Sequence, residues 1–299
     1  MSIKVGAAPV SWGIFELEGL GAPEPYAKVL DEMREAGYEG TELGPYGYLP
    51  TDPARLAAEL SARNLRLVSA FVPVPLTRPE RHEQGFEDAL RVTRLLSALG
   101  GSVIVLADEM TPQRMAVAGR VIEDRDGMNE QQWKSALEIL SRIARACRDF
   151  GVRAAFHPHV GSYVETPREI EELCNRIDAD LLGLCWDTGH YFYGGGDPVD
   201  AVRRYRSRIR HLHLKDIRLS ILENVRGEGL GFLEAVRRGL FCELGEGGVD
   251  VAAVIKGLMA CGYDQWAVVE QDVDASKSDA RPLESALRSR NYLRTVIGI

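Results

Sequence analysis

The stretch LGLCWDTGH, residues 182–190, has the form of a buried strand that runs straight into a turn or a helix. Its first residues are apolar without alternation, which is typical of a strand covered on both faces of a parallel sheet. The flanking segments, Thr166–Arg176 and Asp197–Tyr205, both begin with a helix-capping residue followed by proline. A strand between two such helices predicts a βαβ unit.

The same alternation of strand and helix continues along the whole chain. The predicted strands are Lys4–Pro9, Gly40–Leu43, Arg66–Val72, Val103–Ala107, Arg153–His157, Leu182–Asp187, Arg210–Leu214 and Trp266–Glu270. The predicted helices are Tyr26–Ala36, Asp52–Arg63, Glu87–Leu99, Asn129–Phe150, Thr166–Arg176, Asp197–Tyr205 and Asp250–Cys261. Since about 250 residues of this pattern close into one barrel, the 299 residues predict a single α/β domain over residues 1–299, a (β/α)8 TIM barrel.

Three long loops follow the predicted strands and are expected to set specificity: Pro73–Gln84, Asp108–Gly127 and Ile217–Gly248. The last contains a short helical pattern, Gly231–Gly239. Long loops in compact domains are often lids over a site.

Charge and composition narrow the class of partner. The net charge of −8 disfavours binding to the phosphate backbone of nucleic acids. No stretch approaches the roughly 18 consecutive apolar residues of a membrane span. The N-terminal MSIKVGAAPVSWG has the pattern of a first strand and not of a signal peptide, and the five cysteines form no CxxC pair. We therefore expect a cytoplasmic protein with reduced thiols and with no nucleic-acid or membrane partner.

Ionisable side chains gather at the C-terminal ends of the predicted strands, where TIM barrels place their active sites. They are Glu42 on strand two, His157 at the end of strand five with His159 two residues on, Asp187 at the end of strand six with His190 three residues on, His211 and His213 on strand seven with Lys215 just beyond, and Glu270 at the end of strand eight with Asp272 two residues on. Of the six histidines, only His82 falls elsewhere. Residues two apart on a strand share a face, so these groups can point into one pocket.

Mixed imidazoles and carboxylates suit Mn²⁺, Co²⁺, Zn²⁺ or Fe²⁺, whereas carboxylates alone favour Mg²⁺ or Ca²⁺. The pattern predicts one bound divalent metal ion, with Mn²⁺ or Co²⁺ as first choices and Zn²⁺, Fe²⁺ or Mg²⁺ as alternatives. Such an ion near a ketone and a neighbouring hydroxyl can stabilise an enediolate.

Each of these residues also has a plainer interpretation. A lone strand-end histidine is more often a satisfied core residue, and Asp187 before Thr-Gly-His could simply cap a turn or a helix. Lys215 and Asp216 could form a surface ion pair. The conjunction of several such ends on neighbouring strands favours the metal site over these separate interpretations.

Other motifs give weaker signals. There is no P-loop, no GxGxxG after the first strand and no GxSxG. The run Gly245–Gly248 has the form of a tight turn, with phosphate binding as an alternative. Trp12, Tyr46, Phe71 and Trp186 are candidates for an aromatic pocket wall, although core packing is an equal alternative for Trp186.

Five segments together resemble the sugar isomerase/epimerase-like, or xylose isomerase-like, TIM barrel superfamily. They are FHPHVGSYVET (156–166), WDTGHYFYGGGDP (186–198), HLHLKD (211–216), LGEGGVDVAAVIKGL (244–258) and GYDQWAVVEQD (262–272). The N-terminal APVSWG (8–13) and AGYEGTELG (36–44) fit the same group. Within the superfamily the chain is most similar to the inosose dehydratase family.

The resemblance implies a metal held by His157, Asp187, His213 and Glu270. Epimerases of the superfamily carry a glutamate at the position of His157, and His159 lies nearby, so either histidine could be the strand-five ligand. The missing carboxylate disfavours two-base epimerisation and is compatible with a dehydratase.

The expected function is that of a metal-dependent hydro-lyase that removes water from a polyhydroxylated cyclic ketone such as 2-keto-myo-inositol. Glu270, Lys215 and His159 are the candidate catalytic residues, and His190, Glu42 and Trp12 are candidates for contacts with the polyol or sugar substrate. The alternatives are a sugar isomerase or epimerase, a non-catalytic sugar-binding barrel, and an abasic-site nuclease that the net charge disfavours. Barrels of this kind often pair, which leaves a homo-oligomer as an open alternative.

Overall fold

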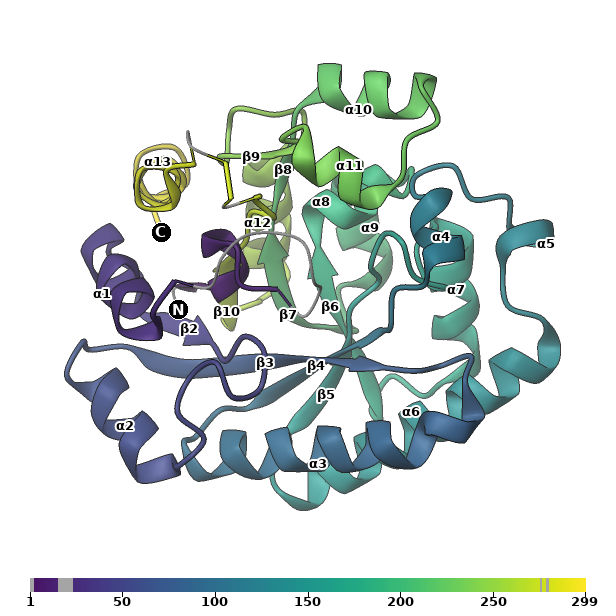
Figure 1. Ribbon diagram of the computed structural model, residues 1–299, viewed down its shortest axis with the longest axis horizontal. Coiled ribbons are helices and arrows are strands. Elements are labelled where there is room, and N and C mark those ends of the chain that lie inside the picture. The colour runs from purple at the N-terminus through teal and green to yellow at the C-terminus, as the bar shows by residue number, and fades with distance from the viewer. Residues whose placement is uncertain (1–2, 16–23, 275, 278–279) are drawn as a thin grey trace.

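A computed structural model describes residues 3–15, 24–274, 276–277 and 280–299. Eight parallel strands close into a barrel in the order β1-β10-β7-β6-β5-β4-β3-β2, with helices around them (Figure 1). The strands are β1 Lys4–Ala7, β2 Gly40–Glu42, β3 Arg66–Val74, β4 Val103–Asp108, β5 Arg153–Phe156, β6 Leu182–Asp187, β7 Ile209–Leu214 and β10 Trp266–Val269. The predicted TIM barrel is confirmed, and every predicted strand is present within two residues of its expected bounds.

The main helices cover the barrel, and local capping contacts fix where several of them begin. They are α1 Tyr26–Ala36, α2 Pro53–Ser61, α3 His82–Ala98, α6 Glu130–Asp149, α7 Pro167–Arg176, α9 Pro198–Tyr205, α12 Val251–Ala260 and α13 Pro282–Tyr292. Capping boxes start α6, with Asn129 and Gln132, and α7, with Thr166 and Glu169. Helix α3 begins five residues before its predicted start, because the 3₁₀ turn Pro79–Arg81 leads directly into it.

Helix α13 was not predicted from the sequence. Only Ala286, Ser289 and Arg290 are buried on it, so it lacks the apolar stripe by which an amphipathic helix is recognised.

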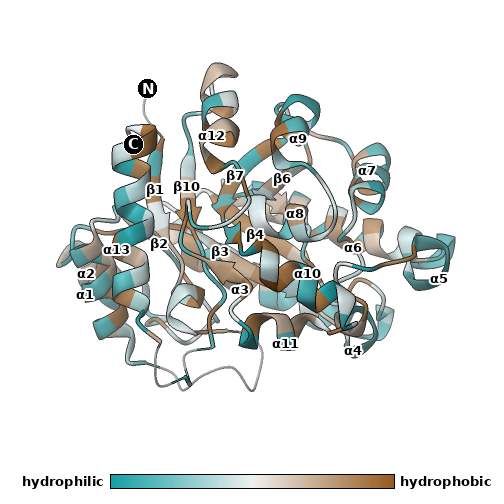
Figure 2. Ribbon diagram, turned by 90° about the horizontal axis from the view of Figure 1, so that it is seen from above, coloured by the Kyte–Doolittle hydropathy of each residue, from teal (hydrophilic) through white to brown (hydrophobic). Residues whose placement is uncertain are grey.

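Shorter elements extend the loops that follow the strands. They are the 3₁₀ turn Pro9–Trp12, α4 Pro112–Ala116, α5 Glu123–Asp126, α8 Thr188–Tyr193, α10 Leu219–Gly227, α11 Phe232–Arg237, and the antiparallel pair β8 Asp216–Ile217 and β9 Phe241–Cys242. The helix predicted at Gly231–Gly239 is α11. Figure 2 shows α4, α10 and α11 side by side at one edge of the molecule. None of the described helices is both long and apolar enough to cross a membrane.

Alternation along the strands separates an inner from an outer core. Val103, Val105, Ala155 and Cys185 form a small cluster inside the barrel with Phe71. Their strand neighbours belong to the large cluster between the barrel and the helices. Inward residues continue on the same parity toward the strand ends, so His157 follows Ala155 and Asp187 follows Cys185.

Asp216 lies within the loop that follows β7 and excludes two of the alternatives left open by the sequence. It is fully buried, and its carboxylate accepts hydrogen bonds from the backbone N–H groups of Ile217, Gly245, Gly247 and Val249 at 2.8 to 3.0 Å. It is therefore no partner in a surface ion pair with Lys215. The backbone donors of the glycine turn face this internal anion, which excludes the phosphate alternative for that turn.

We expect Asp216→Ala to lower the free energy of unfolding by about 3 kcal/mol or more, because several buried N–H groups lose their acceptor. The matched control is Asp250→Ala, which removes the cap of α12 and should cost about 1 kcal/mol. Urea denaturation followed by circular dichroism measures both. Equal losses in the two variants would contradict this account of the loop.

Candidate metal centre and active site

The register of neighbouring strands brings four distant segments together. Asp187 at the end of β6 pairs with His213 on β7, and His213 pairs with Val268, two residues before Glu270. His157 follows β5, where its backbone N–H donates to Leu106 O at 2.7 Å. The side chains of His157, Asp187, His213 and Glu270 all point into the mouth of the barrel, and we call them the four-residue group.

The donor atoms of the four-residue group lie within 4.8 Å of one another, and all four residues are buried. His213 Nδ1 is 3.3 Å from Glu270 Oε2 and 3.8 Å from Asp187 Oδ2, and His157 Nε2 is 3.5 Å from the same Asp187 oxygen. In the described part of the chain, neither Asp187 Oδ2 nor His213 Nδ1 has a hydrogen-bond partner. Buried polar atoms rarely lack a partner, so this set of donors fits a metal ion.

Neighbouring contacts fix which atom of each residue faces the group. Asp187 Oδ1 accepts from His190 N at 2.7 Å and caps α8, so Oδ2 is left to face the mouth. The capping interpretation and the ligand interpretation of Asp187 are therefore compatible. His213 Nε2–H donates to Glu42 Oε1 at 2.8 Å, which leaves its Nδ1 directed at the group.

Glu42 is an orienting residue for His213. Its Oε1 also accepts from Ser69 Oγ at 2.7 Å and from His211 Nε2 at 2.9 Å. Burial alone would raise the pKa of Glu42, but His213 and His211 hold it well below its usual range. A carboxylate that fixes the ring of a ligating histidine is a common outer partner in metal sites.

Lys215 lies beside the four-residue group. Its Nζ is 2.9 Å from Glu270 Oε2, 2.9 Å from Asp272 Oδ1 and 3.6 Å from Asp187 Oδ2. Burial alone would lower the pKa of Lys215, but these three carboxylates raise it well above the usual value. The amine is therefore protonated at neutral pH and can donate a proton or a hydrogen bond, which makes it unsuited to act as a base.

His159 and His190 stack against each other with ring centroids 3.8 Å apart. Burial and nearby positive charge lower the pKa of both rings, so both are neutral. His190 Nε2 accepts from Lys215 Nζ at 3.0 Å. His159 Nδ1–H donates to Val160 O at 2.7 Å, so Nε2 is the nitrogen that carries the lone pair.

A cavity of about 230 Å³ lies over these groups. Its polar lining includes Glu42, Asp108, His157, His159, Lys215, Glu270 and Asp272, and its apolar lining includes Pro9, Ile14, Phe71, Met110 and Phe232. The cavity thus combines hydrogen-bonding groups with carbon surface.

Trp12 does not line this cavity, so the structure does not support the expectation that it contacts substrate. Its Nε1–H donates to Glu32 Oε2 at 2.6 Å, on α1, and the ring packs beneath α13. A sequence cannot reveal that the turn after β1 rotates this ring outward. Trp186 likewise packs outside the barrel, against Tyr191 and Tyr205, and Tyr46 is exposed. Phe71 alone of the four aromatic candidates lines the cavity.

Sequence reasoning did not single out Asp108, and it placed Asp272 at the end of strand eight without giving it a role. Asp272 follows Glu270 by two residues, and this spacing was the available signal. Asp108 ends β4, and its two oxygens accept from Leu76 N at 3.1 Å and Tyr163 N at 2.9 Å. Burial raises the pKa of Asp108 to about 7.

Three other groups of described residues could hold a metal by proximity, and each is a poorer fit. One uses Cys185, which belongs to the small apolar cluster inside the barrel. A second is Glu42 with His211 and His213, which already bond to one another. The third is His159 with His190 and Asp272, and two of its three members, His190 and Asp272, already bond to Lys215 Nζ.

A closed parallel barrel with imidazoles and carboxylates at its mouth defines the class of metal-binding TIM barrels. Residues 30–296 match the family described as xylose isomerase-like TIM barrel, and the chain belongs to this family. The chain is 32% identical to an inosose dehydratase of Lacticaseibacillus casei over 299 residues, which covers 100% of this chain and 99% of the relative. It is also 32% identical to an inosose dehydratase of Clostridium botulinum (strain Alaska E43 / Type E3), over 98% of this chain and 96% of the relative.

Solved structures share the fold at lower identity. A crystal structure of the IOLI protein with a bound zinc atom superposes with a TM-score of 0.72 at 16% identity, covering 99% of this chain and 98% of that one. The probable 3-DHS dehydratase AsbF from Bacillus anthracis gives a TM-score of 0.73 at 17% identity, with 98% and 99% covered.

His213→Ala should abolish metal binding while the barrel stays folded, because it removes the nitrogen between two carboxylates. Glu42→Gln should weaken metal affinity by about 10- to 100-fold, as is typical for an outer partner. His82→Ala, outside the site, is the control and should bind as the parent does. Elemental analysis and competition with a chelator measure affinity. Parent-like metal content in His213→Ala would refute this assignment.

Proposed function

We propose that the protein is a metal-dependent hydro-lyase that removes water from a polyhydroxylated cyclic ketone of the inosose type, with 2-keto-myo-inositol as the first candidate. One observation carries the proposal: the Lys215 amine lies 2.9 Å from Glu270, which is itself part of the four-residue group. A proton acceptor and a proton donor thus face the same cavity. The full-length relatives named inosose dehydratase support the choice of substrate.

His157, Asp187, His213 and Glu270 would hold the metal, with Mn²⁺ or Co²⁺ as first choices and Zn²⁺, Fe²⁺ or Mg²⁺ as alternatives. When bound, a divalent ion at this place would polarise the ketone and acidify the C–H bond beside it.

The residues of the chain then divide the proton transfers. Glu270 takes the proton from the carbon beside the carbonyl, and the Lys215 ammonium gives a proton to the β-hydroxyl, which leaves as water while a C=C bond forms. His159 accepts a hydrogen bond from a substrate hydroxyl through Nε2. Phe71 and Phe232 cover the C–H surface of the ring.

An isomerase or epimerase that acts through an enediolate is the second candidate. Asp272 favours it, because this second carboxylate also bonds Lys215 Nζ, at 2.9 Å, and lines the same cavity as Glu270. Residence in the cytoplasm and pairing of copies stay predictions from the sequence.

Lys215→Gln separates the two proton transfers. With the metal-loaded protein and 2-keto-myo-inositol in D₂O, we expect the variant to retain deuterium exchange beside the carbonyl but to lose water elimination by about 10²- to 10⁴-fold, the usual contribution of a general acid. Proton NMR follows both events in one sample.

The control for this experiment is Lys256→Gln on the outer face of α12. A panel of inososes and ketoses tests the substrate class. Exchange without water loss in the parent protein would favour the isomerase, and tight binding without either event would favour a sugar-binding barrel.

A further inference from the structure

Glu165 is a buried acid for which the proposed chemistry gives no role. It is 1% exposed, lies outside the cavity lining, and precedes the capping residue of α7. Burial raises its pKa to about 7, although the backbone donors of Gly161 and Gly119 and the charge of Arg114 oppose that rise. An acid is costly to bury unless its oxygens are bonded, so its partners indicate its role.

The two oxygens of Glu165 join two different active-site loops. Oε2 accepts from Gly161 N at 2.8 Å, in the loop after β5, and Oε1 accepts from Gly119 N at 2.7 Å, in the segment between α4 and α5. Both glycines have positive φ, 88° and 71°. A Cβ at Gly119 would come within 2.4 Å of the Tyr193 ring, so the close approach itself requires glycine there.

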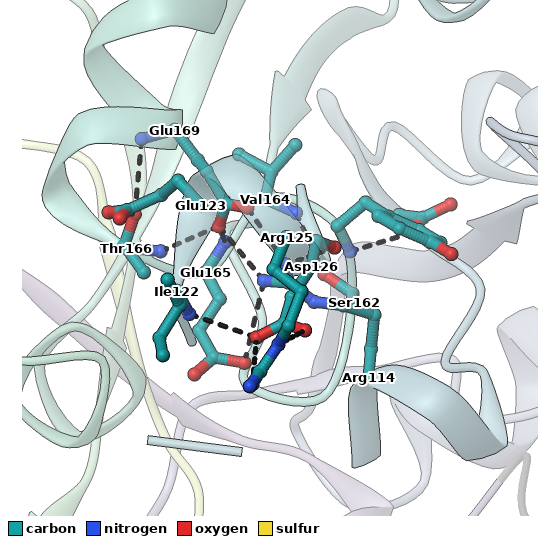
Figure 3. A network of polar contacts seen from close by, with 12 residues as sticks. Arg114, Ile122, Glu123, Arg125, Asp126, Ser162, Val164, Glu165, Thr166 and Glu169 are labelled. Carbon is teal, nitrogen blue, oxygen red and sulfur yellow. Dashed lines mark hydrogen bonds and ion pairs between the residues drawn. The ribbon is translucent and has the colours of Figure 1, made fainter. Parts of the chain in front are cut away.

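A buried arginine, Arg114, lies near the carboxylate of Glu165 (Figure 3). Arg114 bonds both oxygens of Glu169 at 2.9 and 3.0 Å and lies 3.9 Å from Glu165 Oε2. It also donates to Asp126 O at 3.0 Å. Helices α4, α5 and α7 are thereby tied to one buried cluster of charge.

The loop that Glu165 ties is the one that carries His159. Residues 159–162 form a turn in which Ser162 N and Ser162 Oγ both donate to His159 O, at 3.1 and 2.7 Å. Gly161 lies inside this turn, two residues after His159. The Val160 carbonyl that receives His159 Nδ1–H belongs to the same turn, so any shift at Gly161 moves the acceptor that fixes the tautomer of His159.

We propose that Glu165 is a positioning residue, which fixes the turn 159–162 against the segment 117–121 and so aims His159 Nε2 into the cavity. The role rests on the proposed function, because it assumes that His159 acts on a substrate hydroxyl. Asp108 holds the residue that follows this turn, because it accepts a hydrogen bond from Tyr163 N.

Glu165→Gln is the discriminating variant, because an amide keeps the shape but offers one acceptor where two N–H groups need one each. At about pH 8, where the parent residue is mostly ionised, we expect kcat to fall by about 10- to 100-fold with unchanged metal content. Amide hydrogen exchange should rise in residues 117–121 and 157–164. Glu172→Gln, on the exposed side of the same α7, is the control and should behave as the parent does.

Two measurements separate positioning from general weakening of the fold. In a His159→Gln background, Glu165→Gln should cause no further loss of kcat if it acts through His159; an equal further loss would overturn the proposal. Nitrogen-15 NMR of labelled histidine should show His159 as the Nδ1–H tautomer in the parent and a mixture in Glu165→Gln. An unchanged tautomer and unchanged exchange would also overturn it.

The NMR result keeps this proposal distinct from the proposed function. If the parent turns over no inosose but the tautomer of His159 still changes in Glu165→Gln, the dehydratase assignment fails and the positioning role stands.

Discussion

The balance of buried charge at the mouth of the barrel is the constraint on which the rest of the site depends. Four carboxylates lie buried in this one region: Glu42, Asp187, Glu270 and Asp272. Charges removed from water need partners. Glu42 finds them in two histidines and a serine, Asp272 finds one in Lys215, and the four-residue group is left with donors that suit a cation. Folding and metal binding are therefore parts of one electrostatic problem.

Hydrogen bonds to neighbouring residues fix the geometry of the four-residue group. One oxygen of Asp187 accepts a hydrogen bond at the N-terminus of α8, so this helix fixes the direction of the other oxygen. The ring of His213 is oriented by Glu42, a residue of β2 that lies far from His213 in the sequence. Asp187 and His213 are thus each oriented by a contact with a residue outside the four-residue group.

The sequence predicts the barrel and much of the site because both follow from short periods. Unalternating apolar runs mark the strands, and the parity of HLHLK places His211, His213 and Lys215 on one face. The rest depends on contacts between loops that no period reveals. Trp12 turns outward to Glu32, and Asp216 turns inward to four amides of its own loop. Glu165 joins residues 119 and 161, which are more than forty positions apart. Helix α13 was missed for the opposite reason, since its buried side carries few apolar residues.

The loop after β7 also bears on whether this barrel can bind a phosphate group. TIM barrels often seat a substrate phosphate on amides near their seventh and eighth strands. Here Asp216 occupies such amides with a carboxylate of the chain itself. A phosphate group that approached these amides would find them already paired with a negatively charged carboxylate. This loop would therefore have to change before the barrel could bind a phosphate group at this place.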